Sequence, residues 1–222
     1  MKSYKYYSVI TGLFTAALLI SNTLDTKLFA VGPFALPAGI ILFPLTYLFG
    51  DILTEVYGYT ASRKVIWTGF GSLALMVISY DIARAIPAAP FWEYQHAFDL
   101  ILGRVPRIVM ASITAYFLGE FTNSFVLAKL KVRSGGKGMA FRFIASTFFG
   151  QAVDTMVFVL VAFLGTMDAR SLLLVFLSGW GFKVLWEVVM LPVSIPIVKR
   201  LKKAENEDYF DDTTDFNPFK VS

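Results

Sequence analysis

The chain has 222 residues, of which 56% are hydrophobic and 16% charged, and its formal net charge is +4. Soluble domains average about 45–50% apolar and about 25% charged residues, so this composition excludes an ordinary water-soluble domain and predicts one all-α membrane domain. The absence of cysteine excludes disulfides and thiolate chemistry, and a single histidine, His96, argues against a histidine-based metal centre. No cofactor is expected. The basic residues flank apolar segments, so a lipid bilayer and not a nucleic acid is the expected partner.

Six apolar runs are long enough to cross a bilayer, whose core of about 30 Å needs about 20 helical residues. They lie at about 6–24, 36–57, 65–84, 105–128, 141–163 and 171–198. The sequence therefore predicts a six-helix transmembrane domain over residues 1–203.

The connections between these runs carry their own signals. Gly32, Pro33 and Pro37 predict a tight hairpin or a short re-entrant cap in the first connection. The aromatic residues of 85–104 predict a short helix lying on the membrane surface. The acidic stretch 204–222 predicts a disordered cytoplasmic tail.

Lysine and arginine are unevenly divided between alternate loops. The N-terminus, the second and fourth loops and the segment after the last run are rich in these residues, whereas the odd-numbered loops are poorer. Because positively charged loops stay in the cytoplasm, both termini are expected there. The chain is expected to be a multi-pass protein of the cell (inner) membrane. This orientation requires an even number of spans and agrees with six.

Polar residues within the spans give the chemical signal. They occur as pairs three or four residues apart: Asp51 and Glu55, Glu120 and Asn123, Gln151 and Asp154, Lys183 and Glu187. Each ionisable group facing lipid would cost about 2.5–3.5 kcal/mol, so these side chains should face the bundle interior. Such spacing places each pair on one side of its helix. The pairs are therefore expected to converge on a common site for a small solute.

Structural roles remain alternatives for parts of this set. Lys183 and Glu187 could form an ion pair between turns of one helix. Five acids against one base form neutral pairs poorly, however, which favours proton-linked transport or a ligand that presents N–H groups or a positive charge. Phe149 and Trp186 neighbour the polar pairs and are candidates for stacking on a planar ligand. Asn22 is a further candidate, with a hydrogen bond at its helix end as the alternative.

Four segments carry a family resemblance: residues 43–58 (FPLTYLFGDILTEVYG), 111–119 (ASITAYFLG), 145–155 (ASTFFGQAVDT) and 182–184 (FKV). With them the chain resembles the queuosine precursor transporters, a family of vitamin-uptake-like membrane proteins. The resemblance implies a six-helix fold similar to the substrate-binding subunits of energy-coupling-factor transporters. It also implies uptake of a 7-deazaguanine such as preQ0 or preQ1, used to make queuosine in tRNA.

The resemblance and the chemistry of the base together suggest roles for the candidate residues. Glu120 or Asp154 would accept hydrogen bonds from the N–H edge, and Gln151 and Asn123 would complete the recognition. Lys183 would lie near the carbonyl or hold Glu187. Asp51 and Glu55 would gate the site or carry protons.

Two other classes of function remain open. A substrate-binding subunit that needs a separate ATPase would fit the stripe of small residues Ser8, Gly12 and Ala16, which could dock a partner helix as well as pack ordinarily. A homodimer is also compatible with the sequence. An intramembrane aspartyl enzyme would need a second aspartate such as Asp81, but Leu48 stands where that signature needs glycine.

Overall fold

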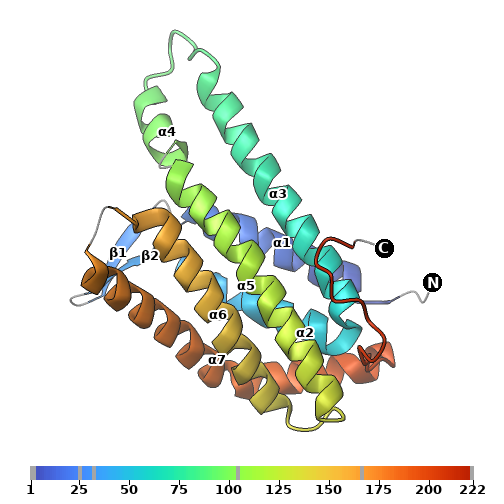
Figure 1. Ribbon diagram of the computed structural model, residues 1–222. Coiled ribbons are helices and arrows are strands. Elements are labelled where there is room, and N and C mark those ends of the chain that lie inside the picture. Colours follow the sequence, from blue (N-terminus) through green and yellow to red (C-terminus); the bar gives the residue numbers. More distant parts are fainter. Residues whose placement is uncertain (1–3, 25–26, 32–33, 104–105, 166–167, 221–222) are drawn as a thin grey trace.

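The computed structural model describes residues 4–24, 27–31, 34–103, 106–165 and 168–220, and they form a bundle of long helices (Figure 1). Seven α-helices occur in these ranges, which confirms the predicted helical class. They are α1 (Tyr7–Leu24), α2 (Phe43–Tyr57), α3 (Tyr59–Ala85), α4 (Gln95–Leu102), α5 (Pro106–Arg133), α6 (Met139–Phe163) and α7 (Ala169–Glu205).

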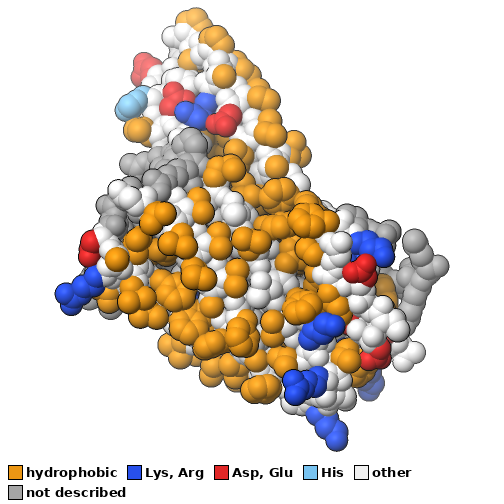
Figure 2. All heavy atoms as spheres, viewed as in Figure 1, with side chains coloured by type: hydrophobic (Ala, Val, Ile, Leu, Met, Phe, Trp, Pro, Cys, Tyr) orange, Lys and Arg blue, Asp and Glu red, His pale blue; other side chains and the backbone are white. Residues whose placement is uncertain are grey.

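Length and apolarity qualify four of these helices as membrane spans, namely α1, α3, α6 and α7. Hydrophobic side chains cover the middle of the visible face, and most lysines and arginines gather at one end of the bundle (Figure 2). The chain is therefore a multi-pass membrane protein, while the count of six spans stays a prediction.

Helix α2 is shorter than the predicted span 36–57. Its 15 residues rise about 22 Å, which is less than the hydrocarbon core. An antiparallel hairpin of β1 (Leu28–Val31) and β2 (Phe34–Pro37) and a 3₁₀ turn, Ala38–Ile41, precede it. Proline cannot donate the backbone hydrogen bond that a helix interior needs, so Pro37 and Pro44 confine the helix to the segment after the turn. Of the two predictions for the first connection, the structure gives the hairpin.

Glycines let α5 and α6 approach closely where they cross. A Cβ on Gly119 would lie 2.5 Å from Cβ of Asp154, and one on Gly150 would lie 2.7 Å from Cβ of Asn123. Each added Cβ would also lie 3.1 Å from the carbonyl oxygen of the other glycine. This backbone contact sets the polar residues of the two helices against each other.

The C-terminal tail is folded against the bundle, so the expectation of a disordered tail from residue 204 is wrong. Helix α7 continues to Glu205, and the chain then crosses the junction between α2 and α3 (Figure 1). The tail's acids take specific partners: the Asp211 carboxylate accepts a hydrogen bond from the Tyr59 backbone N–H at 3.0 Å. Phe216 packs its ring on Tyr59. The acidic composition of the tail gave no indication of these contacts, which involve an aromatic ring and the backbone N–H at the start of α3.

The residues just before α1 meet the end of α7 at one end of the bundle. The backbone N–H groups of Lys5 and Tyr6 donate to the Glu205 carboxylate at 2.8 and 2.6 Å. Tyr57 donates to the same carboxylate at 2.8 Å. This common location agrees with an even number of membrane crossings, and the cytoplasmic orientation of that end stays a prediction from the basic loops.

Candidate substrate-binding site

Seven polar residues from four helices form what we call the central cluster. They are Asp51 on α2, Glu120 and Asn123 on α5, Gln151 and Asp154 on α6, and Lys183 and Glu187 on α7. All but Asp154 and Lys183 are buried, and those two are mostly so. The fold thus brings together one member or both of each pair that the spacing singled out.

Helices α2, α5 and α7 meet around Asp51. The Asn123 side-chain amide donates to Oδ1 of Asp51 at 2.8 Å. Glu187 lies within electrostatic range of Asp51 and is hydrogen-bonded to Thr147 of α6. The carboxyls of Asp51 and Glu187 and the amide of Asn123 therefore lie close together.

Lys183 pairs with Asp154 of α6 and not with Glu187 of its own helix. Its ammonium also lies 5.6 Å from the ring centre of Tyr47. The alternative of an ion pair between turns of the last span is therefore wrong. Sequence spacing could not reveal this partner because the pair joins two helices.

Glu120 stands on the other side of the cluster, with its carboxylate directly against Gly50. Asp154 is the charged group that acts on it. A side chain at position 50 would displace this carboxylate, which explains the glycine before Asp51. Three carboxyls, those of Asp51, Glu120 and Glu187, thus share the cluster with a single ion pair.

Several buried oxygen atoms in this region have no hydrogen-bond partner among the described residues. They are Asp51 Oδ2, Glu120 Oε1, Asn123 Oδ1 and Gln151 Oε1, together with Tyr116 Oη and Thr155 Oγ1. An unsatisfied buried polar group costs about 1–3 kcal/mol, so native proteins keep few of them. The amide oxygens of Asn123 and Gln151 can only accept hydrogen bonds, and so can the oxygens of Asp51 and Glu120 when these carboxyls are ionised. The arrangement suits a ligand that carries several N–H donors.

Four of the candidate residues lie outside this cluster. The Asn22 amide donates to the Leu18 carbonyl of its own helix at 2.8 Å, which is the alternative weighed for it. Phe149 is 53% exposed and Trp186 is 36% exposed, and both lie on the outer faces of their helices. Phe149 stands two residues from Gln151, and a step of two turns a helix by about 200°. Glu55 is buried in a separate group of charges near the end of the bundle.

Tyr116 and Thr155 are members of the site that the polar pairs did not identify. Tyr116 precedes Glu120 by four residues, and Thr155 follows Gln151 by four. The same helical spacing that joined each pair would have found them. Tyr116 lies within electrostatic range of Glu120 and Asp154, and the Tyr47 ring lies under Lys183, so these two residues offer the cluster aromatic surface in place of Phe149 and Trp186.

Comparisons with known proteins show the family of the chain. The family described as "Putative vitamin uptake transporter" matches residues 37–197. A protein of Bacillus subtilis (strain 168) named "Probable queuosine precursor transporter" is 26% identical over 168 residues, which cover 75% of this chain and 73% of that protein. The "Queuosine precursor transporter" of Escherichia coli (strain K12) is 28% identical over 169 residues, which cover 74% of each chain.

No solved structure matches the chain. The relatives are transporters, so the alternative of an intramembrane aspartyl enzyme is set aside. The matched range contains every residue of the central cluster. The family match covers most of the chain, and four helices are long and apolar enough to cross a membrane: the protein belongs to the vitamin uptake transporter family and is a membrane transporter.

Proposed function

We propose that the protein imports a queuosine precursor, a 7-deazaguanine base, and binds it in the central cluster. The observation that carries the proposal is the group of buried acceptor oxygens without partners, on Asp51, Glu120, Asn123 and Gln151. A 7-deazaguanine presents N1–H and a 2-amino group along one edge, and a carboxylate accepts two such donors side by side. The names of the two relatives support this substrate class.

The roles follow from which atoms are already engaged. Asp154 is occupied by Lys183, so the free oxygen of Glu120 is the better acceptor for the N–H edge. The amides of Asn123 and Gln151 can each turn an oxygen or an NH₂ group toward the base. Tyr47 and Tyr116 offer ring surfaces for stacking.

The charge balance favours preQ1 over preQ0. The central cluster holds four acids and one lysine, and that lysine is paired. An aminomethyl cation, which preQ1 carries and preQ0 lacks, would offset part of the surplus. The charge of the central cluster therefore suits the amine of preQ1 better than the uncharged nitrile of preQ0.

A binding subunit that works with a separate ATPase is the second candidate. Ser8, Gly12 and Ala16 lie exposed on α1, and a Cβ on Gly12 would meet no atom within 4 Å. This strip leaves room for the close approach of a partner helix.

Uptake into vesicles distinguishes the two candidates. Purified protein reconstituted into liposomes should accumulate labelled preQ1 in the absence of ATP, at a rate at least about tenfold above protein-free vesicles, since a carrier provides a polar path through the bilayer. Uptake that starts only after an ATPase module is added would replace the carrier by the subunit. A protein that neither takes up nor binds preQ1 or preQ0 would overturn the proposed substrate.

A further inference from the structure

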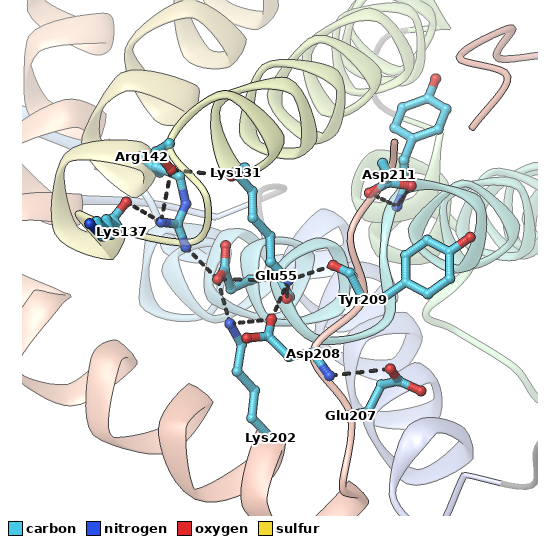
Figure 3. Close-up of polar contacts among 11 residues, drawn as sticks. Glu55, Lys131, Lys137, Arg142, Lys202, Glu207, Asp208, Tyr209 and Asp211 are labelled. Atoms are coloured by element: carbon cyan, nitrogen blue, oxygen red, sulfur yellow. Dashed lines mark hydrogen bonds and ion pairs between the residues drawn. The ribbon is translucent and has the colours of Figure 1, made fainter. Parts of the chain in front are cut away.

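A second buried group of charges, here called the Glu55 cluster, joins five parts of the chain (Figure 3). One carboxylate oxygen of Glu55 on α2 accepts hydrogen bonds from Arg142 of α6 and Lys202 of α7. Lys131 of α5 stands 4.0 Å away. Asp208 of the tail pairs with Lys131 at 2.6 Å and with Lys202 at 2.8 Å. Two carboxylates therefore hold three cations from three helices.

The tail lies across this cluster and is attached on both sides of it. The Tyr209 backbone N–H donates to the Val56 carbonyl at 3.2 Å, while its carbonyl accepts from Lys131 at 2.6 Å. Farther along, Arg63 donates to the Asn217 carbonyl at 2.6 Å, and Trp67 donates to the Pro218 carbonyl at 2.8 Å. The tail thus ties α2, α3 and α5 together at the end of the bundle.

The Asp208 carboxylate of the tail stays ionised and paired with Lys131 and Lys202 at neutral pH. Partial burial alone would raise the pKa of Asp208, but hydrogen bonds from Lys131 and Lys202 hold that pKa below its usual value. A depressed pKa means that the pairing persists above the ordinary carboxyl range and is lost only as the pH falls through the lowered value. The contacts therefore persist at neutral pH.

The Glu55 cluster stands between the central cluster and the end of the bundle where the residues before α1 meet the end of α7. Glu55 follows Asp51 by four residues on α2, a rise of about 6 Å. Arg142 precedes Gln151 by nine residues on α6, a rise of about 14 Å in the same direction. A solute leaving the central cluster toward this end would pass between helices that the Glu55 cluster binds together.

We infer that the Glu55 cluster and the C-terminal tail form a gate, which is closed in this structure and separates when substrate passes this end of the bundle. The inference rests on the proposed transport function. With the termini in the cytoplasm, as the basic loops predict, this is the inner gate. A buried ion pair suits such a role because its desolvation cost nearly offsets its attraction, so that the open, hydrated state differs little in free energy. An apolar plug would resist opening into water more strongly.

A cross-link that pins the tail tests the gate. The chain has no cysteine, so new pairs can be placed without background. Lys129 lies over the ring of Phe216 at 3.9 Å and belongs to neither cluster. Lys129→Cys with Phe216→Cys, joined by a short bis-maleimide, should lower preQ1 uptake at least about tenfold, since a closed gate blocks release. The two single-cysteine variants, treated with the same reagent, give the uptake rate against which the linked protein is compared, so that any loosening of the tail by Phe216→Cys alone is measured separately. An unchanged uptake rate in the linked protein would overturn the gate.

A measurement without substrate separates failure of the gate from failure of the proposed function. Thr147 is buried on α6, one turn from Gln151 on the side of Arg142. Asp208→Ala removes the ion pairs with Lys131 and Lys202, and Tyr209→Ala removes the ring that lies against Gly58, so the two changes should weaken the tail. In detergent, a water-soluble maleimide should then label Thr147→Cys at least about tenfold faster, since opening governs access. Equal labelling rates with and without those changes would contradict the gate even if uptake were never observed. Faster labelling without uptake would support the gate and contradict the substrate.

Discussion

Replacing Glu55 with alanine is expected to lower the free energy of unfolding by about 3–5 kcal/mol, the usual effect of breaking a buried ion pair on one side. Glu55 is fully buried, and Arg142, which donates to it, is 1% exposed. Removing the carboxylate leaves the Arg142 guanidinium with two oxygen atoms of the loop before α6 as its partners among the described residues, those of the Ser134 hydroxyl and the Lys137 carbonyl. A denaturant titration in mild detergent measures the loss.

Two further variants show whether the effect comes from the buried charge. Lys220→Ala removes one member of an ion pair whose two side chains are both half exposed, so it should change stability by less than about 1 kcal/mol. Adding Arg142→Met to Glu55→Ala should recover part of the lost stability, because the uncompensated cation is gone. If Glu55→Ala were as mild as Lys220→Ala, the Glu55 cluster would not hold this end of the bundle together.

Replacing Glu120 with alanine is expected to weaken substrate binding without lowering the stability of the protein. Binding of preQ1 should weaken by roughly 10–150-fold, since a hydrogen bond to a charged group contributes about 1.5–3 kcal/mol. The unliganded protein should be as stable as before or more so, because Glu120 Oε1 is buried without a partner among the described residues. Titration calorimetry and thermal unfolding of the same preparation give the two values.

The contrast between binding and stability identifies a ligand-binding role. Glu93→Ala, at an exposed acid on the connection before α4, should change neither value. Glu120→Gln keeps the size of the side chain but adds a donor where the base also donates, so its binding should fall as well. A Glu120→Ala protein that binds normally but unfolds more easily would make the residue structural.

Helical spacing and the cost of buried charge were enough to predict the central cluster in outline. A carboxyl in a lipid-facing position costs so much that Asp51, Glu120 and Glu187 had to turn inward, and the i,i+3 and i,i+4 pairs indicated which faces they share. The same logic did not extend to Phe149 and Trp186, because nearness in sequence is not nearness around a helix.

Contacts between distant segments lay beyond the sequence argument. Lys183 pairs with Asp154 of another helix, and the spacing of residues along one helix cannot predict such a pair. The order of the tail depends on Asp211 meeting the free backbone N–H at the start of α3 and on Phe216 packing against Tyr59. The acidic composition of the tail is typical of a disordered segment, but composition does not show which groups of the bundle the tail's acids contact.

The most direct test of the acceptor-lined site compares two ligands that differ in one donor. Calorimetry should show that 7-deazaguanine binds the wild-type protein at least about tenfold more tightly than the analogue that lacks the 2-amino group, because the analogue leaves a buried acceptor unpaired. Equal affinities for the two bases would contradict recognition by these oxygens.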